Sequence, residues 1–339
     1  PATLARTMSR RITIIGDGAM GTTCALMLAE GGCSVRLWSA FADTAEQTDR
    51  LRENRRFLPG FKLPDAIEVT GEDEGVFDGA DLAVSAVPTQ FMRGVWRRLA
   101  EHCPPSLGIC SVAKGIENST LLRPTQIITD VLADSRPTAA LSGPCIAPEV
   151  ASRLPATVVV ASQNRSFAEE LQVLFTRPYF RVYTNDDHVG VEAAGATKNV
   201  IAIAAGILDG MEAGCNAKAA LLTRGVVEIT RLGVALGGQA ETFAGLAGVG
   251  DLVTTCFSPI GRNRSFGEAV GRGKTVQEAL AATESVVEGV ATTESVVELA
   301  GNCGVEMPIT EAVHSVIFAS RSPSEAIEDL MSRPLKAES

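Results

Sequence analysis

Short apolar runs alternate with amphipathic segments along the first half of the chain. The runs have the length and the β-branched content of buried strands, and they cover residues 12–15, 35–38, 81–87, 107–112, 138–142 and 156–161. Amphipathic segments follow two of these runs, at 89–102 and 166–175. Because alternating strands and helices connect by right-handed crossovers, we expect an α/β domain with a mostly parallel, doubly wound sheet.

The strand pattern ends with residues 180–186, and from about residue 189 the chain has the pattern of helices separated by glycine-rich joints. Residues 275–278 (TVQE) form a capping box that opens one of these helices, and residues 310–318 have the pattern of another. We therefore expect two domains, an α/β domain at 1–188 and an all-α domain at 189–339.

The composition is that of a globular protein, with 45% hydrophobic and 21% charged residues in a chain of 339, which is long enough for two cores. No window of about twenty residues lacks charges or turn breakers, so we expect no membrane span. The apolar run at 11–21 is too short for a signal peptide and ends in glycines. We expect a cytoplasmic protein.

The charged residues and the cysteines argue against several partners. The net charge of −10 disfavours nucleic acid, because phosphate binding needs a basic face. An anionic small molecule would instead need a local group of lysines and arginines. The eight cysteines include no C-x-x-C pair and no Cys/His cluster. We therefore expect free buried thiols in a reducing compartment, with neither a disulfide framework nor a metal site.

Residues 16–21 (GDGAMG) form a G-x-G-x-x-G fingerprint that follows the first strand and opens a helix. In this context Gly16 permits the tight turn, Gly18 lets the backbone approach a pyrophosphate, and Gly21 allows close packing of helix on strand. The helix N-terminus adds N–H groups and the positive end of its dipole. The fingerprint predicts a Rossmann-type domain that binds NAD or NADP.

The sequence leaves the choice between NAD and NADP open. In many NAD-binding folds an acidic residue at the end of the second strand holds the ribose hydroxyls. Here that strand ends in 37-LWSAFAD-43, which places Asp43 a few residues late. No arginine stands beside it to bind a 2′-phosphate.

Two stretches at the expected carboxyl edge of the sheet carry candidate polar groups. Lys114 follows the strand at 107–112, where open α/β folds bind ligands. The alternative is a surface lysine on a loop. Residues 142–149 (SGPCIAPE) could present backbone N–H groups from their first four positions, or they could form only a packing turn.

Two stretches of the helical half combine charge with the start of a helix. Asp251 is either a site carboxylate or only the N-cap of the helix that it opens. In 261-GRNRSFGEA-269, Arg262, Asn263 and Arg264 precede a helix and make a natural phosphate cradle. The alternative for this stretch is a solvated basic turn.

A further stretch, 191–208 (VEAAGATKNVIAIAAGIL), places Lys198 and Asn199 among small and aliphatic residues. One interpretation is a core helix whose single lysine extends to water. The other is a reactive ammonium in an apolar wall. Ala194 and Gly195 lie on the helical face of Lys198, where their small size leaves room for a ligand.

Together these segments resemble the NAD(P)-dependent glycerol-3-phosphate dehydrogenase family along nearly the whole chain. The resemblance rests on the order and spacing of segments at 16–21 (GDGAMG), 58–64 (LPGFKLP), 113–115 (AKG), 142–144 (SGP), 198–206 (KNVIAIAAG), 216–225 (NAKAALLTRG), 248–256 (GVGDLVTTC), 261–264 (GRNR) and 286–289 (VVEG). It implies reversible reduction of dihydroxyacetone phosphate to sn-glycerol 3-phosphate, the entry point to phospholipid backbones. It also implies a homodimer.

The resemblance implies roles for the matching residues, with Lys198 as the proton donor and acceptor. The implied substrate-site residues are Lys114, Gly143, Cys145, Asn199, Asp251, Thr255, Gly261, Arg262 and Asn263. The implied cofactor contacts are Gly16, Gly18, Ala19, Met20, Gly21, Lys114, Ala147, Arg262, Val286 and Glu288. The chain departs from the family pattern at Met20, Ala40 and Cys145, where an aromatic residue, a polar or basic residue, and a hydroxyl or amide are common.

The chemistry of hydride transfer to a ketone suits a lysine. Negative charge develops on the carbonyl oxygen, and lysine can surrender a proton to it whereas arginine does not deprotonate. Burial and nearby cations lower a lysine pKa from its usual value of about 10.4. We hypothesise that Lys198 is the acid/base, that Lys114 helps to polarise the carbonyl, that Asp251 orients the site, and that the Arg262–Asn263 loop binds the phosphate.

Two other functions stay open on the sequence. A lysine-dependent hydroxy-acid dehydrogenase of similar two-domain architecture would need a carboxylate clamp, whereas GRNR before a helix favours phosphate. A redox-sensing regulator would bind NAD(H) without turnover. Such a regulator would usually add a nucleic-acid module or a basic recognition helix, and the sequence has no evident one.

Overall fold

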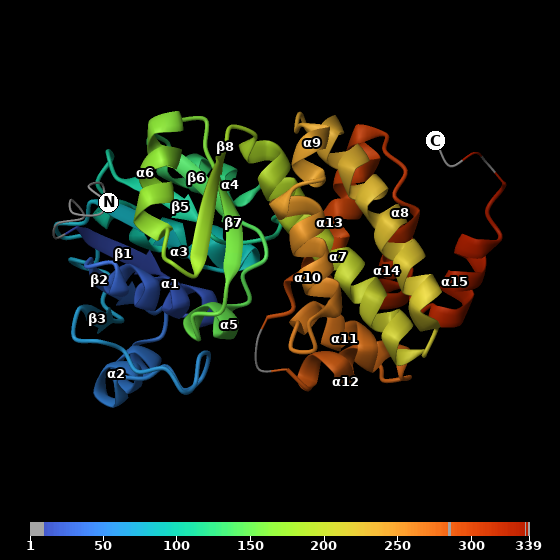
Figure 1. The fold of residues 1–339 in the computed structure, drawn as a ribbon, viewed down its shortest axis with the longest axis horizontal. Coiled ribbons are helices and arrows are strands. Elements are labelled where there is room, and N and C mark those ends of the chain that lie inside the picture. Colours follow the sequence, from blue (N-terminus) through green and yellow to red (C-terminus); the bar gives the residue numbers. More distant parts are fainter. Residues whose placement is uncertain (1–9, 284–285, 336, 338–339) are drawn as a thin grey trace. The chain divides into compact units, whose positions relative to one another are not determined.

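The computed structural model describes residues 10–283, 286–335 and 337, and the chain divides into two compact units (Figure 1). The first unit comprises residues 1–114 and 122–192, and the second comprises residues 115–121 and 193–339. The sequence pattern, by contrast, assigns 115–121 to the α/β domain and divides the chain after residue 188.

An eight-stranded sheet in the order β3-β2-β1-β4-β5-β6-β7-β8 forms the centre of the first unit. The strands are β1 (Arg11–Ile15), β2 (Ser34–Trp38), β3 (Ile67–Thr70), β4 (Leu82–Ser85), β5 (Gly108–Ser111), β6 (Thr138–Ser142), β7 (Ala156–Ala161) and β8 (Phe180–Asn185). All neighbouring strands are parallel except β6 and β7. This confirms the mostly parallel, doubly wound sheet. The strand order reverses between β1 and β4, the point at which such sheets bind their ligands.

Helices cover both faces of this sheet. On one face α1 (Ala19–Glu30) and α6 (Arg165–Phe175) share a core with the strands, and on the other face α3 (Thr89–Leu99) and α4 (Pro124–Leu132) do so. Helix α3 buries Met92, Trp96 and Leu99, whose spacing places them on one helical stripe. The remaining helices of the unit are α2 (Ala42–Leu51), the short 3₁₀ helix η2 (Ala100–His102) and α5 (Ala147–Ala151).

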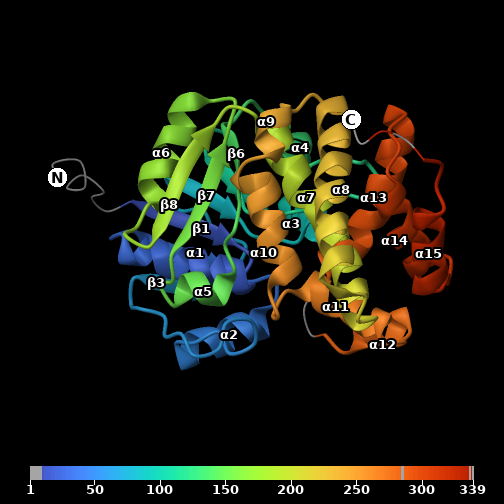
Figure 2. The ribbon, with the colours of Figure 1, turned by 45° about the vertical axis from the view of Figure 1, so that its right-hand side comes forward.

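The second unit is helical throughout its described residues, as the sequence pattern predicts (Figure 2). Helix α7 (His188–Gly210) begins in the first unit, and its residues from Ala193 onward belong to the second. The other helices are α8 (Gly214–Ala235), α9 (Ala240–Phe243), the π-helix η3 (Leu246–Gly250), α10 (Asp251–Phe257), α11 (Arg262–Gly271), α12 (Val276–Ala281), α13 (Glu288–Cys303), α14 (Pro308–Phe318) and α15 (Pro323–Met331). The predicted capping box is confirmed, because the side chains of Thr275 and Glu278 each accept a hydrogen bond from the other's backbone N–H at the start of α12.

Helix α7 is the core helix of the second unit. Its length and apolarity would suffice to cross a membrane, but 94% of its apolar window is buried inside the protein. Among the described residues the other segment that meets those criteria is a bent pair, Ala240–Phe257 with Arg262–Gly271, counted as one span. Burial by protein on all sides is the property of a core helix, and it explains why α7 is apolar all round.

Four glycines bring α7 and α11 into direct backbone contact. Gly206 and Gly210 lie one turn apart on α7, and Gly267 and Gly271 lie one turn apart on α11. A Cβ on any of them would overlap a backbone carbonyl oxygen of the other helix. We call this contact the glycine seam. It fixes the spacing of the two helices at the closest distance that their backbones allow.

Replacing Gly206 by alanine is expected to lower the free energy of unfolding by about 1–3 kcal/mol, because the new Cβ would overlap the Arg264 carbonyl oxygen and force the backbones apart. Gly301 is a matched control, since it is exposed in α13 and a Cβ there meets no atom within 4 Å. Alanine at Gly301 should be neutral or add up to about 1 kcal/mol. Urea unfolding measures both, and equal stabilities would show that the seam is not tight.

Candidate active site

The G-x-G-x-x-G loop joins β1 to α1 in the first unit. Gly16 has a φ of 106°, which favours glycine, and a Cβ on it would lie 2.9 Å from the Ala86 carbonyl oxygen. A Cβ on Gly21 would overlap the carbonyl oxygen of Gly16. The turn and the seating of α1 on the sheet therefore require these two glycines.

Gly18 is not required in the same way. Its φ of −58° suits any residue, and a Cβ on it would meet no heavy atom within 4 Å. As the N-cap of α1 it leaves open space directly in front of a helix N-terminus, with no side-chain cap. A backbone that must approach a pyrophosphate needs this space, and the helix N-terminus supplies N–H groups to the phosphates. The loop therefore fits a dinucleotide.

Buried Asn54 holds this loop from behind. Its Nδ2 donates to the carbonyl oxygen of Asp17 at 2.6 Å and to Thr22 Oγ1 at 2.9 Å, while its Oδ1 accepts from the backbone N–H of Phe57 at 3.1 Å. Sequence reasoning misses Asn54, because a lone asparagine in a loop gives no signal of its distant partners. Its place just before the family segment at 58–64 is the one clue that the sequence holds.

Three of the expected cofactor residues come together at the start of α1. Ala19 and Met20 are the first two residues of that helix, and Ala147 is the first residue of α5. The hydroxyl of Thr23 donates to the carbonyl oxygens of Ala19 at 2.8 Å and Ala147 at 3.2 Å, which ties the two helices together.

Lys114, Gly143 and Cys145 meet beyond the carboxyl ends of β5 and β6. Lys114 Nζ donates to the Gly143 carbonyl oxygen at 3.0 Å and lies 3.7 Å from Cys145 Sγ, and that thiol donates to the same carbonyl at 3.1 Å. Gly143 has a φ of 129°, and a Cβ on it would lie 3.0 Å from Val158 Cα. This segment is thus a tight packing turn that also lies beside a cluster of polar groups. The interpretation of 142–149 as a packing turn is therefore compatible with its interpretation as part of a site.

In the second unit Lys198 is paired inside the protein. Its side chain is 5% exposed, and its Nζ donates to Asp251 Oδ1 at 2.8 Å and to Thr255 Oγ1 at 2.5 Å. The lysine therefore does not extend to water. This rules out the first interpretation of 191–208, in which a core helix carries a lysine that reaches solvent. Asp251 is the first residue of α10, and the N-cap of that helix is Gly250. The Asp251 carboxylate therefore pairs with Lys198 and does not act as the N-cap of α10.

A second junction in this unit joins α7, α11 and α13. Asn263 Oδ1 accepts a hydrogen bond from the backbone N–H of Gly289 at 3.0 Å, and a Cβ on Gly289 would lie 2.9 Å from the carbonyl oxygen of Asn199. Glu288 begins α13 next to this junction, and Val286 is exposed just before it. The backbone N–H of Gly289 is a partner that sequence reasoning did not identify.

Arg262 is the exposed first residue of α11, preceded by Gly261 as an N-cap that makes no side-chain hydrogen bond. Its guanidinium makes no hydrogen bond or ion pair with any residue that the structure describes. Because the first turn of a helix has unpaired N–H groups, an arginine at this position can bind an anion together with them.

The cysteines form neither disulfides nor an evident reactive site. All eight cysteines are free, and six are buried, whereas Cys215 is exposed and Cys303 is partly buried. Burial raises the pKa of the Cys110 and Cys256 thiols to about 12, which makes them poor nucleophiles. Within the described residues no group of histidine, cysteine, aspartate and glutamate side chains could hold a metal ion.

A Rossmann-type sheet whose fingerprint loop faces open space, joined to a helical unit that buries an ammonium against a carboxylate, defines a two-domain nicotinamide-dependent dehydrogenase. Comparison with known proteins identifies the family. The model of the NAD-dependent glycerol-3-phosphate dehydrogenase N-terminus matches residues 11–168, and that of its C-terminus matches residues 187–328. The chain belongs to this family.

Individual relatives agree over nearly the whole chain. Glycerol-3-phosphate dehydrogenase (NAD(P)+) of Geobacter sulfurreducens is 47% identical over 98% of this chain and 99% of its own. A crystal structure of glycerol-3-phosphate dehydrogenase from Coxiella burnetii is 38% identical, with a TM-score of 0.93 over 96% of this chain and 99% of that one. A D-mandelate dehydrogenase structure is 14% identical with a TM-score of 0.63, which shows a similar fold alone.

Replacing Gly18 by valine is expected to weaken NADH binding at least tenfold, because the side chain would fill the space in front of α1. The melting temperature without cofactor should change little, since a Cβ at this position meets no atom. Valine at Gly21 is the contrasting variant and should destabilise the fold itself. Titration of NADH fluorescence and thermal melts measure the two effects, and undiminished binding by Gly18→Val would rule out this loop as the pyrophosphate site.

Proposed function

We propose that this protein interconverts dihydroxyacetone phosphate and sn-glycerol 3-phosphate with NAD(P)H, as the names of its relatives indicate. The observation that supports this most directly is the buried pair of Lys198 and Asp251. An ammonium held in an apolar wall by a carboxylate and a hydroxyl is a poised proton donor for a forming alkoxide.

The nicotinamide, when bound, supplies the hydride that adds to the ketone carbon. Lys198 donates a proton to the developing alkoxide during reduction and takes it back during oxidation. Burial favours a neutral amine, but Asp251 at 2.8 Å acts in the opposite direction and favours the charged ammonium. The charged form is the one that can protonate the alkoxide.

The phosphate of the substrate is assigned to the N-terminus of α11. Arg262 supplies an exposed guanidinium, and Asn263 is fixed there by the N–H of Gly289. Binding at a group remote from the reacting carbon provides free energy for orientation, which a smaller unphosphorylated ketone would lack. Further substrate contacts are assigned by family resemblance to Lys114, Gly143, Cys145, Asn199, Thr255 and Gly261, and cofactor contacts in the second unit to Arg262, Val286 and Glu288.

The family resemblance also supports the biological setting. We place the enzyme in the cytoplasm as a homodimer, where it supplies glycerol 3-phosphate for phospholipid synthesis. No nucleic-acid partner is part of this proposal, since the net charge of −10 disfavours one.

A substrate panel tests the reaction. With NADH and NADPH in turn, we expect dihydroxyacetone phosphate to be reduced with a kcat/KM far above that of any 2-keto acid. Faster turnover of a 2-keto acid would favour the hydroxy-acid dehydrogenase, and NADH binding with no turnover of any substrate would favour the redox sensor. The same panel measures the preference between NADH and NADPH.

Lys198→Met is expected to lower kcat by about 10²–10⁴-fold, because the proton donor is lost, while NADH affinity changes less than about twofold. Removal of the ammonium breaks the buried ion pair with Asp251, which costs about 3–5 kcal/mol of stability. The double variant Lys198→Met with Asp251→Asn removes the Asp251 charge and serves as the folded control. Near-normal turnover in either variant would overturn the acid/base role.

A further inference from the structure

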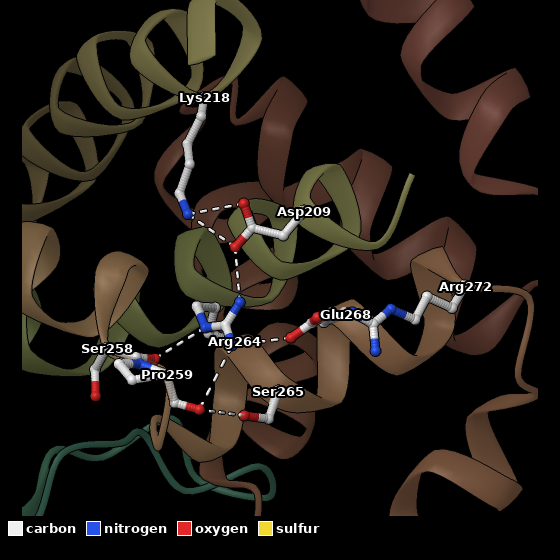
Figure 3. Close-up of polar contacts among 8 residues, drawn as sticks. All are labelled: Asp209, Lys218, Ser258, Pro259, Arg264, Ser265, Glu268 and Arg272. Atoms are coloured by element: carbon white, nitrogen blue, oxygen red, sulfur yellow. Dashed lines mark hydrogen bonds and ion pairs between the residues drawn. The ribbon is translucent and has the colours of Figure 1, made fainter. Parts of the chain in front are cut away.

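Arg264 is the centre of an ionic network in the second unit (Figure 3). Its Nη1 pairs with Asp209 Oδ2 and its Nη2 with Glu268 Oε2, each at 2.8 Å. Lys218 Nζ lies 2.8 Å from both carboxylate oxygens of Asp209. The network therefore connects α11 to the last turn of α7 and the first turns of α8.

The same guanidinium also holds the turn that joins α10 to α11. Arg264 Nε donates to the Ser258 carbonyl oxygen at 2.9 Å, and its Nη2 reaches the Pro259 carbonyl oxygen at 3.5 Å (Figure 3). The hydroxyl of Ser265 lies 3.4 Å from the carbonyl oxygen of Pro259. The backbone oxygens of Ser258 and Pro259 are thus tied to Arg264, whose carboxylate partner Asp209 lies on α7.

Two arginines of the GRNR segment therefore have different surroundings. The side chain of Arg264 is 12% exposed and its donors are occupied by protein, whereas Arg262 is exposed and has no ion-pair partner among the described residues. The sequence pattern predicts that both arginines precede the helix and form one phosphate cradle. Helix α11 instead begins at Arg262, and the guanidinium of Arg264 binds protein groups, so the prediction is wrong for Arg264.

Every charged group of the network has a partner of opposite charge. Burial raises the pKa of Asp209, but hydrogen bonds from Lys218 and Arg264 outweigh burial and hold that pKa below its usual value. Three cations, Arg264, Lys218 and Arg272, thus face the two carboxylates of Asp209 and Glu268. A network whose charged groups are all paired is rigid, which suits it to fix the position of a backbone turn.

Helix α10 is consequently fastened to α7 at both ends. At its start Asp251 pairs with Lys198, and just after its end the Ser258 carbonyl is linked through Arg264 to Asp209. The two attachment points on α7 are 209 − 198 = 11 residues apart, or roughly 16 Å along the helix. Helix α7 therefore sets the distance between the proton donor and the turn that precedes Arg262.

We propose that Arg264 is a positioning residue, which holds the turn after α10, and with it Arg262, at a fixed distance from Lys198. The inference rests on the proposed function, in which this turn binds the substrate phosphate. Without the Arg264 fork the turn would lose its attachment to α7, and a displacement of about 1 Å in such a group can cost about 100-fold in rate.

Arg264→Gln tests the proposal, with Arg272→Gln as the matched control. Arg272 pairs with the other oxygen of Glu268 but is 66% exposed and has no contact with the turn. Arg264→Lys is the second variant, since lysine keeps a charge beside Asp209 but has no planar fork to bind two carbonyls. Thermal melts identify which variants are folded. If Arg264→Gln is unfolded, Arg264→Lys is used to test the proposal.

The decisive measurement is the ratio of kcat/KM for dihydroxyacetone phosphate to kcat/KM for dihydroxyacetone. We expect Arg264→Gln to lower this ratio about 10-fold to 100-fold, through both KM and kcat, with NADH affinity unchanged. Arg264→Lys should lower it less, and Arg272→Gln should leave it within twofold. A ratio that is unchanged in both Arg264 variants, whatever their stability, overturns the proposal.

Calorimetric binding of inorganic phosphate to the NADH-loaded protein separates this inference from the proposed function. If the wild type binds phosphate and Arg264→Gln binds it at least tenfold more weakly, Arg264 positions an anion site even when dihydroxyacetone phosphate is not turned over. If dihydroxyacetone phosphate is turned over and phosphate binding and the kcat/KM ratio both survive in Arg264→Gln, the function stands and the inference fails. If the wild type neither turns over dihydroxyacetone phosphate nor binds phosphate, both fail.

Discussion

The structure of the helical unit depends on the direct backbone contact between α7 and α11. Gly206, Gly210, Gly267 and Gly271 allow two helices to meet without intervening side chains. One consequence is that α7 lies deep enough to bury Lys198. Another consequence is that the position of the first turn of α11, with Arg262 and Asn263, is set by the contact with α7. A larger residue in the seam would force α11 away from α7 and so change the distance between Arg262 and Lys198.

The helical unit encloses several charged side chains, and each of them has a partner within the protein. An unpaired ionised group in the interior is strongly destabilising, so each buried charge needs a partner of good geometry. Asp251 meets this need for Lys198, and Arg264 and Lys218 meet it for Asp209. Glu228 of α8 illustrates a third solution, because it accepts the backbone N–H groups of Ile309 and Thr310 at the start of α14.

Much of this arrangement can be predicted from the sequence, because local patterns encode strands, helices, caps and the glycine loop. Edge strand β3 escapes prediction, because it has only four residues (IEVT) and only the first of them is buried. Contacts between distant side chains cannot be predicted for another reason. Lys198 and Asp251 are separately recognisable, but their positions are 53 residues apart in the sequence, and no local signal indicates that they meet. Arg262 and Arg264 look equivalent in sequence, but Arg264 pairs with Asp209, which is 55 residues away in the chain and gives no local signal.

Lysine is among the most flexible side chains, and holding one rotamer costs about 2 kcal/mol of entropy. Both groups that fix Lys198, the Asp251 carboxylate and the Thr255 hydroxyl, belong to the protein itself. The entropy is therefore lost when the chain folds and not when the ketone binds. This ordering lowers the stability of the protein, and under the proposed function the ketone meets an ammonium that needs no further ordering.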